Sequence, residues 1–246
     1  MKKIINWKTF LILFIACLIT SVLVIPYQVA LVPELSDLGI MLYASALVQA
    51  AVIFSIVTFT GLLLAPKTNF KLPILEGKDL KKELKKILLP GIIWGVISGV
   101  LIIIFSLLFA DLSLEIAQPV PILTSFLASF YGGIAEEVLM RLFVMTLLVW
   151  IILKLSKKDT KEPTKWSIWL AILISSVLFG IGHLPITSAI TEINLMVVVR
   201  AIVLNGIGGV IFGLLYWKKG LEAAIIAHFS ADIVLHVMLP IVLRIL

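Results

Sequence analysis

The sequence is short of charge and of cysteine. Only 14% of its 246 residues are charged, whereas 61% are hydrophobic and the mean hydropathy is +1.19. Soluble globular domains carry about 25% charged residues, so this composition excludes a soluble domain and indicates a polytopic membrane protein. The single cysteine, Cys17, lies in an apolar segment. A disulfide framework and a cysteine metal cluster are therefore both excluded.

Long hydrophobic runs are abundant by contrast. A helix needs about 20 mostly apolar residues to cross a bilayer, and seven stretches qualify: 8–25, 42–64, 89–110, 120–153, 167–184, 196–217 and 221–243. The first follows Lys2 and Lys3 as in a signal peptide, but its core is long and no A-x-A-like cleavage site follows, which favours a retained anchor. We see no internal repeat or low-complexity segment, so we expect one all-α membrane domain, a polytopic helical bundle over residues 1–246.

The basic residues indicate how the bundle is oriented. Seventeen of the twenty Lys and Arg lie in the N-terminal tail, in 65–88, in 154–165 and at Lys218–Lys219, and these sites alternate with connections almost free of them. The acidic residues of the other connections are Glu34, Asp37, Asp111, Glu115 and Glu192. The positive-inside rule then predicts a multi-pass protein of the cell membrane with a cytoplasmic N-terminus and an external C-terminus. The net charge of +6 reflects this topology and does not indicate a nucleic-acid partner.

The segment "KLPILEGKDLKKELKKILLPG", residues 71–91, alternates leucines and lysines at helical spacing. We expect it to form an amphipathic helix on the cytoplasmic interface, attracted by anionic headgroups, before Pro90 begins the third span. A solvated linker helix is the alternative.

Small residues mark one face of the sixth run, where Gly206, Gly209 and Gly213 are expected to admit a neighbouring helix closely. Asn205 beside them is expected to hydrogen-bond across helices.

Charged residues inside the fourth run form the stretch "EEVLMR", residues 136–141. Glu137 and Arg141 are i, i+4 neighbours in the favourable order, which predicts an ion pair. Glu136 points about 100° away from Glu137 on an α-helix, so it requires another partner.

Two further runs also contain ionisable residues. His183 ends the fifth run, and His228 and Asp232 share one face of the seventh at i, i+4 spacing. Each Asp or Arg at the centre of a span costs about 2.5–3.5 kcal/mol, whereas an intramembrane hydrogen bond returns only about 0.6 kcal/mol on average. A purely structural cluster of buried polar groups is therefore the weaker interpretation, and we expect a polar functional pocket between three helices.

These segments resemble the motifs of a known family. "EEVLMR", "FGIGH" (residues 179–183) and "HFSAD" (residues 228–232) are similar to E-E-x-x-x-R, F-x-x-x-H and H-x-x-x-[N/D] of the CPBP intramembrane proteases. That family, also called Abi, contains CAAX-prenyl endopeptidases and bacteriocin-processing or self-immunity proteins. The resemblance covers about residues 120–235, the expected catalytic core, and implies a helical fold whose cavity opens toward the cytoplasm and the bilayer.

The resemblance also implies roles for individual residues. Glu136 and His183 would position and activate the hydrolytic water, and His228 and Asp232 would stabilise the tetrahedral oxyanion. Glu137 and Arg141 would support the first motif. The eukaryotic members carry Asn at the last position, and Asp232 can donate to an oxyanion only when it is protonated.

The chemistry of these residue types agrees with a hydrolase. Desolvation and a neighbouring carboxylate make a buried carboxylate a stronger base, which suits general-base catalysis. Glu136, His183 and His228 also form a respectable zinc-ligand set. A metal-free mechanism is favoured, with zinc kept as the alternative cofactor.

Three other polar or aromatic residues are less favoured as functional residues of the pocket. Ser230 lies about 160° around the helix from His228, so a serine nucleophile is disfavoured. We expect His236 and Phe179 to be packing residues, with a wall of the substrate groove as the alternative role of Phe179.

The functional hypothesis is an intramembrane endopeptidase that cleaves a peptide or lipidated protein tail near the cytoplasmic face, with membrane lipids as its other partners. It requires Glu136, His183 and His228 to lie around one pocket. A non-catalytic bacteriocin self-immunity or peptide-binding membrane protein is the alternative. A proton-coupled transporter is disfavoured because no inverted repeat is visible.

Overall fold

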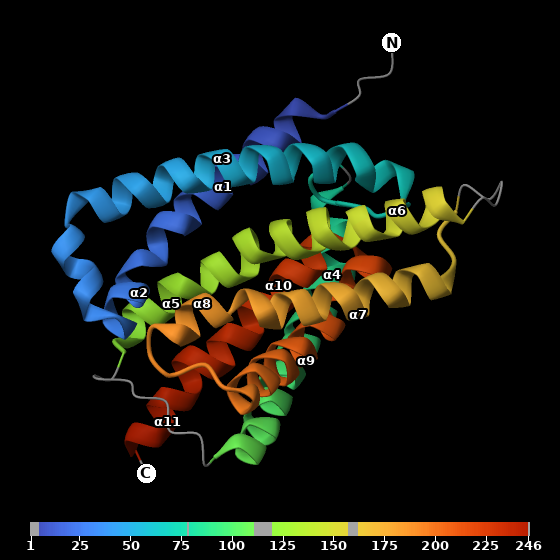
Figure 1. Cartoon of the computed structure of the whole chain (residues 1–246). Helices are drawn as coiled ribbons and strands as arrows, with labels where there is room; N and C mark the ends of the chain where they lie inside the picture. The colour runs from blue at the N-terminus through green and yellow to red at the C-terminus, as the bar shows by residue number, and fades with distance from the viewer. Residues whose placement is uncertain (1–4, 78, 111–119, 157–161, 246) are drawn as a thin grey trace.

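The computed structural model describes residues 5–77, 79–110, 120–156 and 162–245, and every regular element in these ranges is helical (Figure 1). The α-helices are α1 (Trp7–Leu23), α2 (Ile25–Leu31), α3 (Ile40–Leu64), α4 (Leu80–Ser106), α5 (Ile122–Phe130), α6 (Thr146–Leu155), α7 (Lys165–Gly182), α8 (Leu184–Ser188), α9 (Leu195–Lys219), α10 (Leu221–Asp232) and α11 (Leu239–Ile245). Short 3₁₀ turns occupy η1 (Pro33–Leu38), η2 (Ala65–Lys67) and η3 (Leu107–Phe109). Three π-helical segments are η4 (Tyr131–Glu136), η5 (Val138–Met145) and η6 (Ile233–Met238).

Seven helical stretches within the described residues are long and apolar enough to cross a membrane. They are Trp7–Leu31, Ile40–Lys67, Leu80–Phe109, Ile122–Leu155, Lys165–Ser188, Leu195–Lys219 and Leu221–Ile245. Each overlaps one of the seven hydrophobic runs, so the prediction of an all-α, multi-pass membrane bundle is confirmed. Several charged residues on which the predicted orientation depends, among them Lys2, Lys3, Asp111, Glu115 and residues 157–161, lie outside the described residues.

The predicted boundary at Pro90 is wrong. Asp79 accepts a hydrogen bond from the backbone N–H of Lys82 at 3.0 Å, and α4 then continues through Pro90 to Ser106. The amphipathic residues therefore form the first turns of the third span instead of a separate interfacial helix. Proline removes one helical hydrogen bond, but buried Ile87 lies before it and Gly91 packs against Ile226 of α10 behind it. This packing on both sides holds the helix continuous.

Close packing of α9 against α7 forms one side of the core. A Cβ atom on Gly209 would lie 2.7 Å from the Cβ of Ser176, and one on Gly213 would lie 3.2 Å from the Cγ1 of Ile172. The predicted packing role is confirmed for these two glycines. It is wrong for Gly206, where a Cβ atom would have no neighbour within 4 Å. Asn205 donates to the carbonyl of Ala201 in its own helix at 2.9 Å, so the predicted bond across helices is also wrong.

Helix α10 is held between two glycine-bearing surfaces. On one side, Gly95 of α4 lies so close to the carbonyl of Ala227 that any Cβ would overlap it. On the other side, Gly133 of η4 lies against Phe229, where a Cβ would be 3.0 Å from the Phe229 Cβ. Alanines 223, 224, 227 and 231 of α10 are all buried. Small residues thus bring α4, η4 and α10 together around the segment that carries His228 and Asp232.

The start of α10 is tied to the connection between η2 and α4. Glu222 accepts hydrogen bonds from the backbone N–H groups of Ile74 and Leu75 at 2.8 and 2.9 Å. The N–H of Leu221 donates to the carbonyl of Lys71 at 3.1 Å. This role of Glu222 was not predicted, because the residue stands at the very start of an apolar run and resembles a loop acid. Its contacts fold the connection over this end of the bundle.

The two glycines of α9 provide a matched test of this packing. Gly209→Ala should lower the melting temperature in detergent, because overpacking typically costs about 1–3 kcal/mol. Gly206→Ala should leave stability unchanged or raise it, since alanine exceeds glycine in helix propensity by about 1 kcal/mol. Unfolding is measured with a maleimide dye that reacts when buried Cys17 becomes exposed. Equal effects of the two substitutions would contradict the assigned packing.

Candidate active site

The helix that carries Glu136 and Glu137 is locally widened. The segments η4 and η5 are π-helical on either side of Glu137, and the Thr146 hydroxyl donates to the carbonyl of Arg141, five residues earlier, at 3.0 Å. π-Helical turns occur frequently at functional sites. Because more residues fit in each turn, the 100° spacing of an α-helix does not apply along this stretch. The Glu136 side chain remains 22% exposed and lines a cavity, whereas that of Glu137 is fully buried.

Glu137 joins two helices through one carboxylate oxygen. Its Oε1 lies 2.9 Å from Nη1 of Arg141, which confirms the predicted ion pair, and 2.8 Å from Nδ1 of His228 on α10. The contact with His228 was not predicted, because it depends on how α10 packs on the fourth span. A carboxylate can only accept, so Nδ1–H of His228 is the donor and the ring orientation is fixed. Nε2 of His228 is left available for other partners.

Aromatic rings hold His228 and Arg141 in place. The imidazole of His228 stacks on Phe212 with ring centroids 4.6 Å apart and meets Phe179 edge-on at 5.6 Å. The guanidinium of Arg141 lies 5.0 and 5.3 Å from the centroids of Phe179 and Phe212, within the range of cation–π attraction. Arg141 also donates to the carbonyl of Gly209 at 3.2 Å. Phe179 is thus a packing residue, as expected, and it also lines the cavity.

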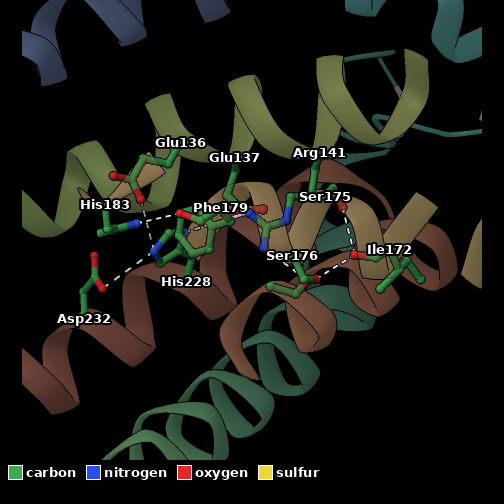
Figure 2. Close-up of polar contacts among 11 residues, drawn as sticks. Glu136, Glu137, Arg141, Ile172, Ser175, Ser176, Phe179, His183, His228 and Asp232 are labelled. Atoms are coloured by element: carbon green, nitrogen blue, oxygen red, sulfur yellow. Dashed lines mark hydrogen bonds and ion pairs between the residues drawn. The ribbon is translucent and has the colours of Figure 1, made fainter. Parts of the chain in front are cut away.

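Two carboxylates face the free nitrogen of His228 (Figure 2). Glu136 Oε2 and Asp232 Oδ1 each lie 3.7 Å from His228 Nε2, beyond direct hydrogen-bond distance. Gly132 lies beside them, where any Cβ would overlap the Asp232 carboxylate. The absence of a side chain at residue 132 therefore lets the acid approach this histidine.

His183 lies on the other side of Phe179. Its Nδ1 lies 2.8 Å from the carbonyl of Phe179, one turn earlier, and therefore donates to it. The Phe179 ring packs edge-on against the His183 ring at 4.7 Å. Nε2 of His183 is consequently the nitrogen that remains available for other partners.

A cavity of about 470 Å³ unites the four residues predicted to be catalytic. Glu136, His183, His228 and Asp232 all line it, whereas Glu137 and Arg141 lie behind its wall. Its lining also includes polar residues without a predicted role in the site, which are Tyr27, Gln28, Ser106, Tyr131, Arg200, Asn205 and His236.

Two of these lining residues bear on the sequence predictions. Arg200 has no ion-pair or hydrogen-bond partner among the described residues, and its charge within the sixth run was the signal that could have revealed it. His236 contacts the Tyr27 ring at 5.8 Å, which agrees with packing, but it also reaches the cavity.

Ser230 faces away from this site. Its hydroxyl donates to the carbonyl of Ile226 at 2.7 Å, and its Cβ lies against Gly95 of α4. The prediction that it is not a nucleophile agrees with this position.

The described residues contain no group of three or more His, Cys, Asp or Glu side chains that could hold a metal ion. Glu136, His183 and His228, the set considered for zinc, do not form such a group. The residues as they lie therefore do not fit a zinc centre. The metal-free mechanism stays a prediction.

A family model matches part of the chain. The model of a family described as Type II CAAX prenyl endopeptidase Rce1-like matches residues 118–234. This range contains all three motifs and the four cavity residues named above. The predicted resemblance to the CAAX proteases is thereby confirmed. No curated protein and no solved structure matches the chain significantly.

The buried pair makes a stability prediction. Glu137→Gln keeps an acceptor for His228 but removes the charge opposite Arg141, and breaking a buried pair typically costs about 3–5 kcal/mol. We expect a marked fall in melting temperature in the Cys17 dye assay. The double variant Glu137→Leu/Arg141→Met should melt closer to the parent, because no unpaired buried charge remains. A Glu137→Gln variant as stable as the parent would show that the pair does not stabilise the bundle.

Proposed function

Because residues 118–234 match the Rce1-like type II CAAX prenyl endopeptidase family, we propose that the chain is an intramembrane endopeptidase whose reaction takes place in the cavity between Glu136, His183, His228 and Asp232. The substrate is a peptide or a lipidated protein tail held in the membrane. One observation carries this proposal. Inside a cavity, carboxylate oxygens of Glu136 and Asp232 each lie 3.7 Å from Nε2 of His228, whose ring orientation is fixed.

In the first step Glu136 acts as the general base. Its carboxylate is the more exposed of the adjacent glutamates and has no buried cation bound to it, unlike Glu137. It takes a proton from a water molecule, while Nε2 of His183, whose Nδ1–H is bound to Phe179, accepts the second water hydrogen and orients the oxygen. The water oxygen forms a bond to the scissile carbonyl carbon, and the carbonyl electrons move to its oxygen.

In the second step the new oxyanion is stabilised by His228. When the ring is protonated on both nitrogens, Nδ1–H remains bound to Glu137 and Nε2–H donates to the oxyanion. Asp232, when protonated, offers a second donor from the next turn of the same helical segment. Collapse of the intermediate breaks the C–N bond, and the proton held by Glu136 passes to the leaving amine.

The residues behind the cavity wall act as positioning groups. Glu137 fixes the tautomer and direction of His228, and Arg141 neutralises Glu137 while its Nη2 is bound to Gly209. A hydrogen bond from the far nitrogen of a histidine to a buried carboxylate is the usual way proteins orient such rings.

Replacement of the general base tests the proposal directly. Glu136→Gln should lower the cleavage rate of a peptide panel by at least about 100-fold, the range expected for loss of a general base, without changing the melting temperature. Glu192→Gln, an exposed acid outside the cavity, is the matched control. Cleavage is measured with purified protein before and after exhaustive chelation, and the metal-free mechanism expects no effect of the chelator.

A different experimental result would reject each part of the proposal. Undiminished cleavage by Glu136→Gln would reject Glu136 as the base, and loss of cleavage after chelation would reject the metal-free mechanism. A bacteriocin-immunity effect that survives Glu136→Gln intact would favour the non-catalytic alternative.

Asp232 can be tested against the Asn found at the corresponding position of the eukaryotic members. If Asp232 donates to the oxyanion, wild-type activity must fall as rising pH removes its proton, because only the protonated carboxyl can donate. Asp232→Asn supplies a permanent donor, so it should retain activity within about threefold and lose that alkaline fall, a change small against the 10²–10⁴ range of general catalysis. The measurement is kcat against pH for both proteins. A strong loss in Asp232→Asn at every pH would instead assign Asp232 an anionic role.

A further inference from the structure

The cavity lies toward one end of the bundle. Its lining includes Tyr27 near the end of the first span, Ser106 at the end of α4, His183 just past the end of α7, Arg200 near the start of α9 and Leu239 at the start of α11. Because successive spans run in opposite directions, all these positions belong to the same end. Figure 1 shows α2, α5, α8 and α11 gathered there.

Direct contacts confirm that these ends meet. The rings of Tyr27 and His236 are 5.8 Å apart, which joins the first and last spans. Arg244 of α11 donates to the carbonyl of Val120, just before α5, at 3.3 Å. The cavity residues therefore extend from His228 toward the end of the bundle formed by α2, α5 and α11.

At the opposite end of the bundle, side chains pack tightly between His228 and the surface. Met145, Leu221 and Ala224 are fully buried there, and the hydroxyls of Thr146 and Tyr216 are 2.9 Å apart. Beyond this layer the Phe70 ring packs on Tyr216 at 4.6 Å, and Glu222 binds the backbone of Ile74 and Leu75. Among the described residues, this layer separates the cavity from the closed end.

The closed end is also the basic end. Lys71, Lys86, Lys218 and Lys219 line a separate polar hollow there, and Lys154 and Lys165 flank the α6–α7 connection at the same end. The positive-inside rule assigns such connections to the cytoplasm. The cavity then extends toward the outer side of the membrane.

We infer that the cavity receives its peptide from the outer side of the membrane, so that the substrate is an exported peptide or the outward-facing tail of a membrane-anchored protein. The route follows from the cavity walls and the charge distribution, whereas the cleavage of the occupant rests on the proposed protease function. This differs from the cytoplasm-facing cavity that the family resemblance implies. It also differs from the expected cleavage near the cytoplasmic face.

Cysteine labelling of the full chain in right-side-out membrane vesicles tests the route without any need for activity. Gln28→Cys and Ala128→Cys place thiols on the cavity wall, and Lys219→Cys places one at the basic end. The parent chain, whose only cysteine is buried, is the control. The probe is a membrane-impermeant maleimide, which reacts with thiols in water and not with thiols in lipid. In a second measurement, a water-soluble peptide that cannot cross the membrane is added outside the vesicles. The extent of Gln28→Cys labelling then shows whether the peptide protects this thiol from the maleimide.

We expect both cavity cysteines to be labelled in sealed vesicles and Lys219→Cys only after permeabilisation. Labelling of Lys219→Cys in sealed vesicles, or of the cavity cysteines only after permeabilisation, would overturn the inference. Cavity cysteines that never react would overturn it too, because the cavity would not be open to water. If the labelling is as expected but Glu136→Gln still cleaves peptides, the route stands and the catalytic proposal alone fails.

Discussion

The buried carboxylate of Glu137 is the interaction on which the site depends. One oxygen faces both the guanidinium of Arg141 and the imidazole of His228, at 2.9 and 2.8 Å. In a medium of low dielectric constant an uncompensated carboxylate would be very costly, so the three groups must be assembled together. Their assembly fixes the relative position of the fourth and seventh spans. The histidine nitrogen that faces the cavity is therefore positioned by an ion pair that lies behind the cavity wall.

Such an assembly requires helices that approach closely, and glycines provide the space. Gly132 leaves room for the Asp232 carboxylate, Gly133 for Phe229, and Gly209 for Ser176 and for the bond between its carbonyl and Arg141. Small residues drive helix packing in membranes because lipid supplies no hydrophobic force between helices. The glycines that surround the motifs are thus part of the site, since a methyl group at residue 132 would displace the acid that faces His228.

The sequence predicted the spans from composition and the Glu137–Arg141 pair from spacing within one helix. It predicted a shared pocket for Glu136, His183, His228 and Asp232 from the cost of ionisable residues in lipid and from the family resemblance. It did not predict the bond between Glu137 and His228, since residues 91 positions apart meet only through packing. The continuous α4 was missed because the effect of Pro90 was judged locally, whereas Gly91 packs against α10 and Ile87 is buried. Gly206 and Asn205 were misassigned because helical spacing identifies a face but not its neighbour.

The residues of the last span differ on the two sides of His228. The groups that hold the His228 ring lie on one side, and the cavity lies on the other. One turn toward the basic end stands Ala224, fully buried, whereas one and two turns in the other direction stand Asp232 and His236, which line the cavity. The attraction between Glu137 and Arg141 is stronger in the buried layer, because charges attract more strongly where water is excluded. The proposed hydrolysis requires water on the cavity side. A single histidine at the boundary can serve both, with Nδ1 bound to Glu137 in the closed layer and Nε2 facing the carboxylates of the cavity.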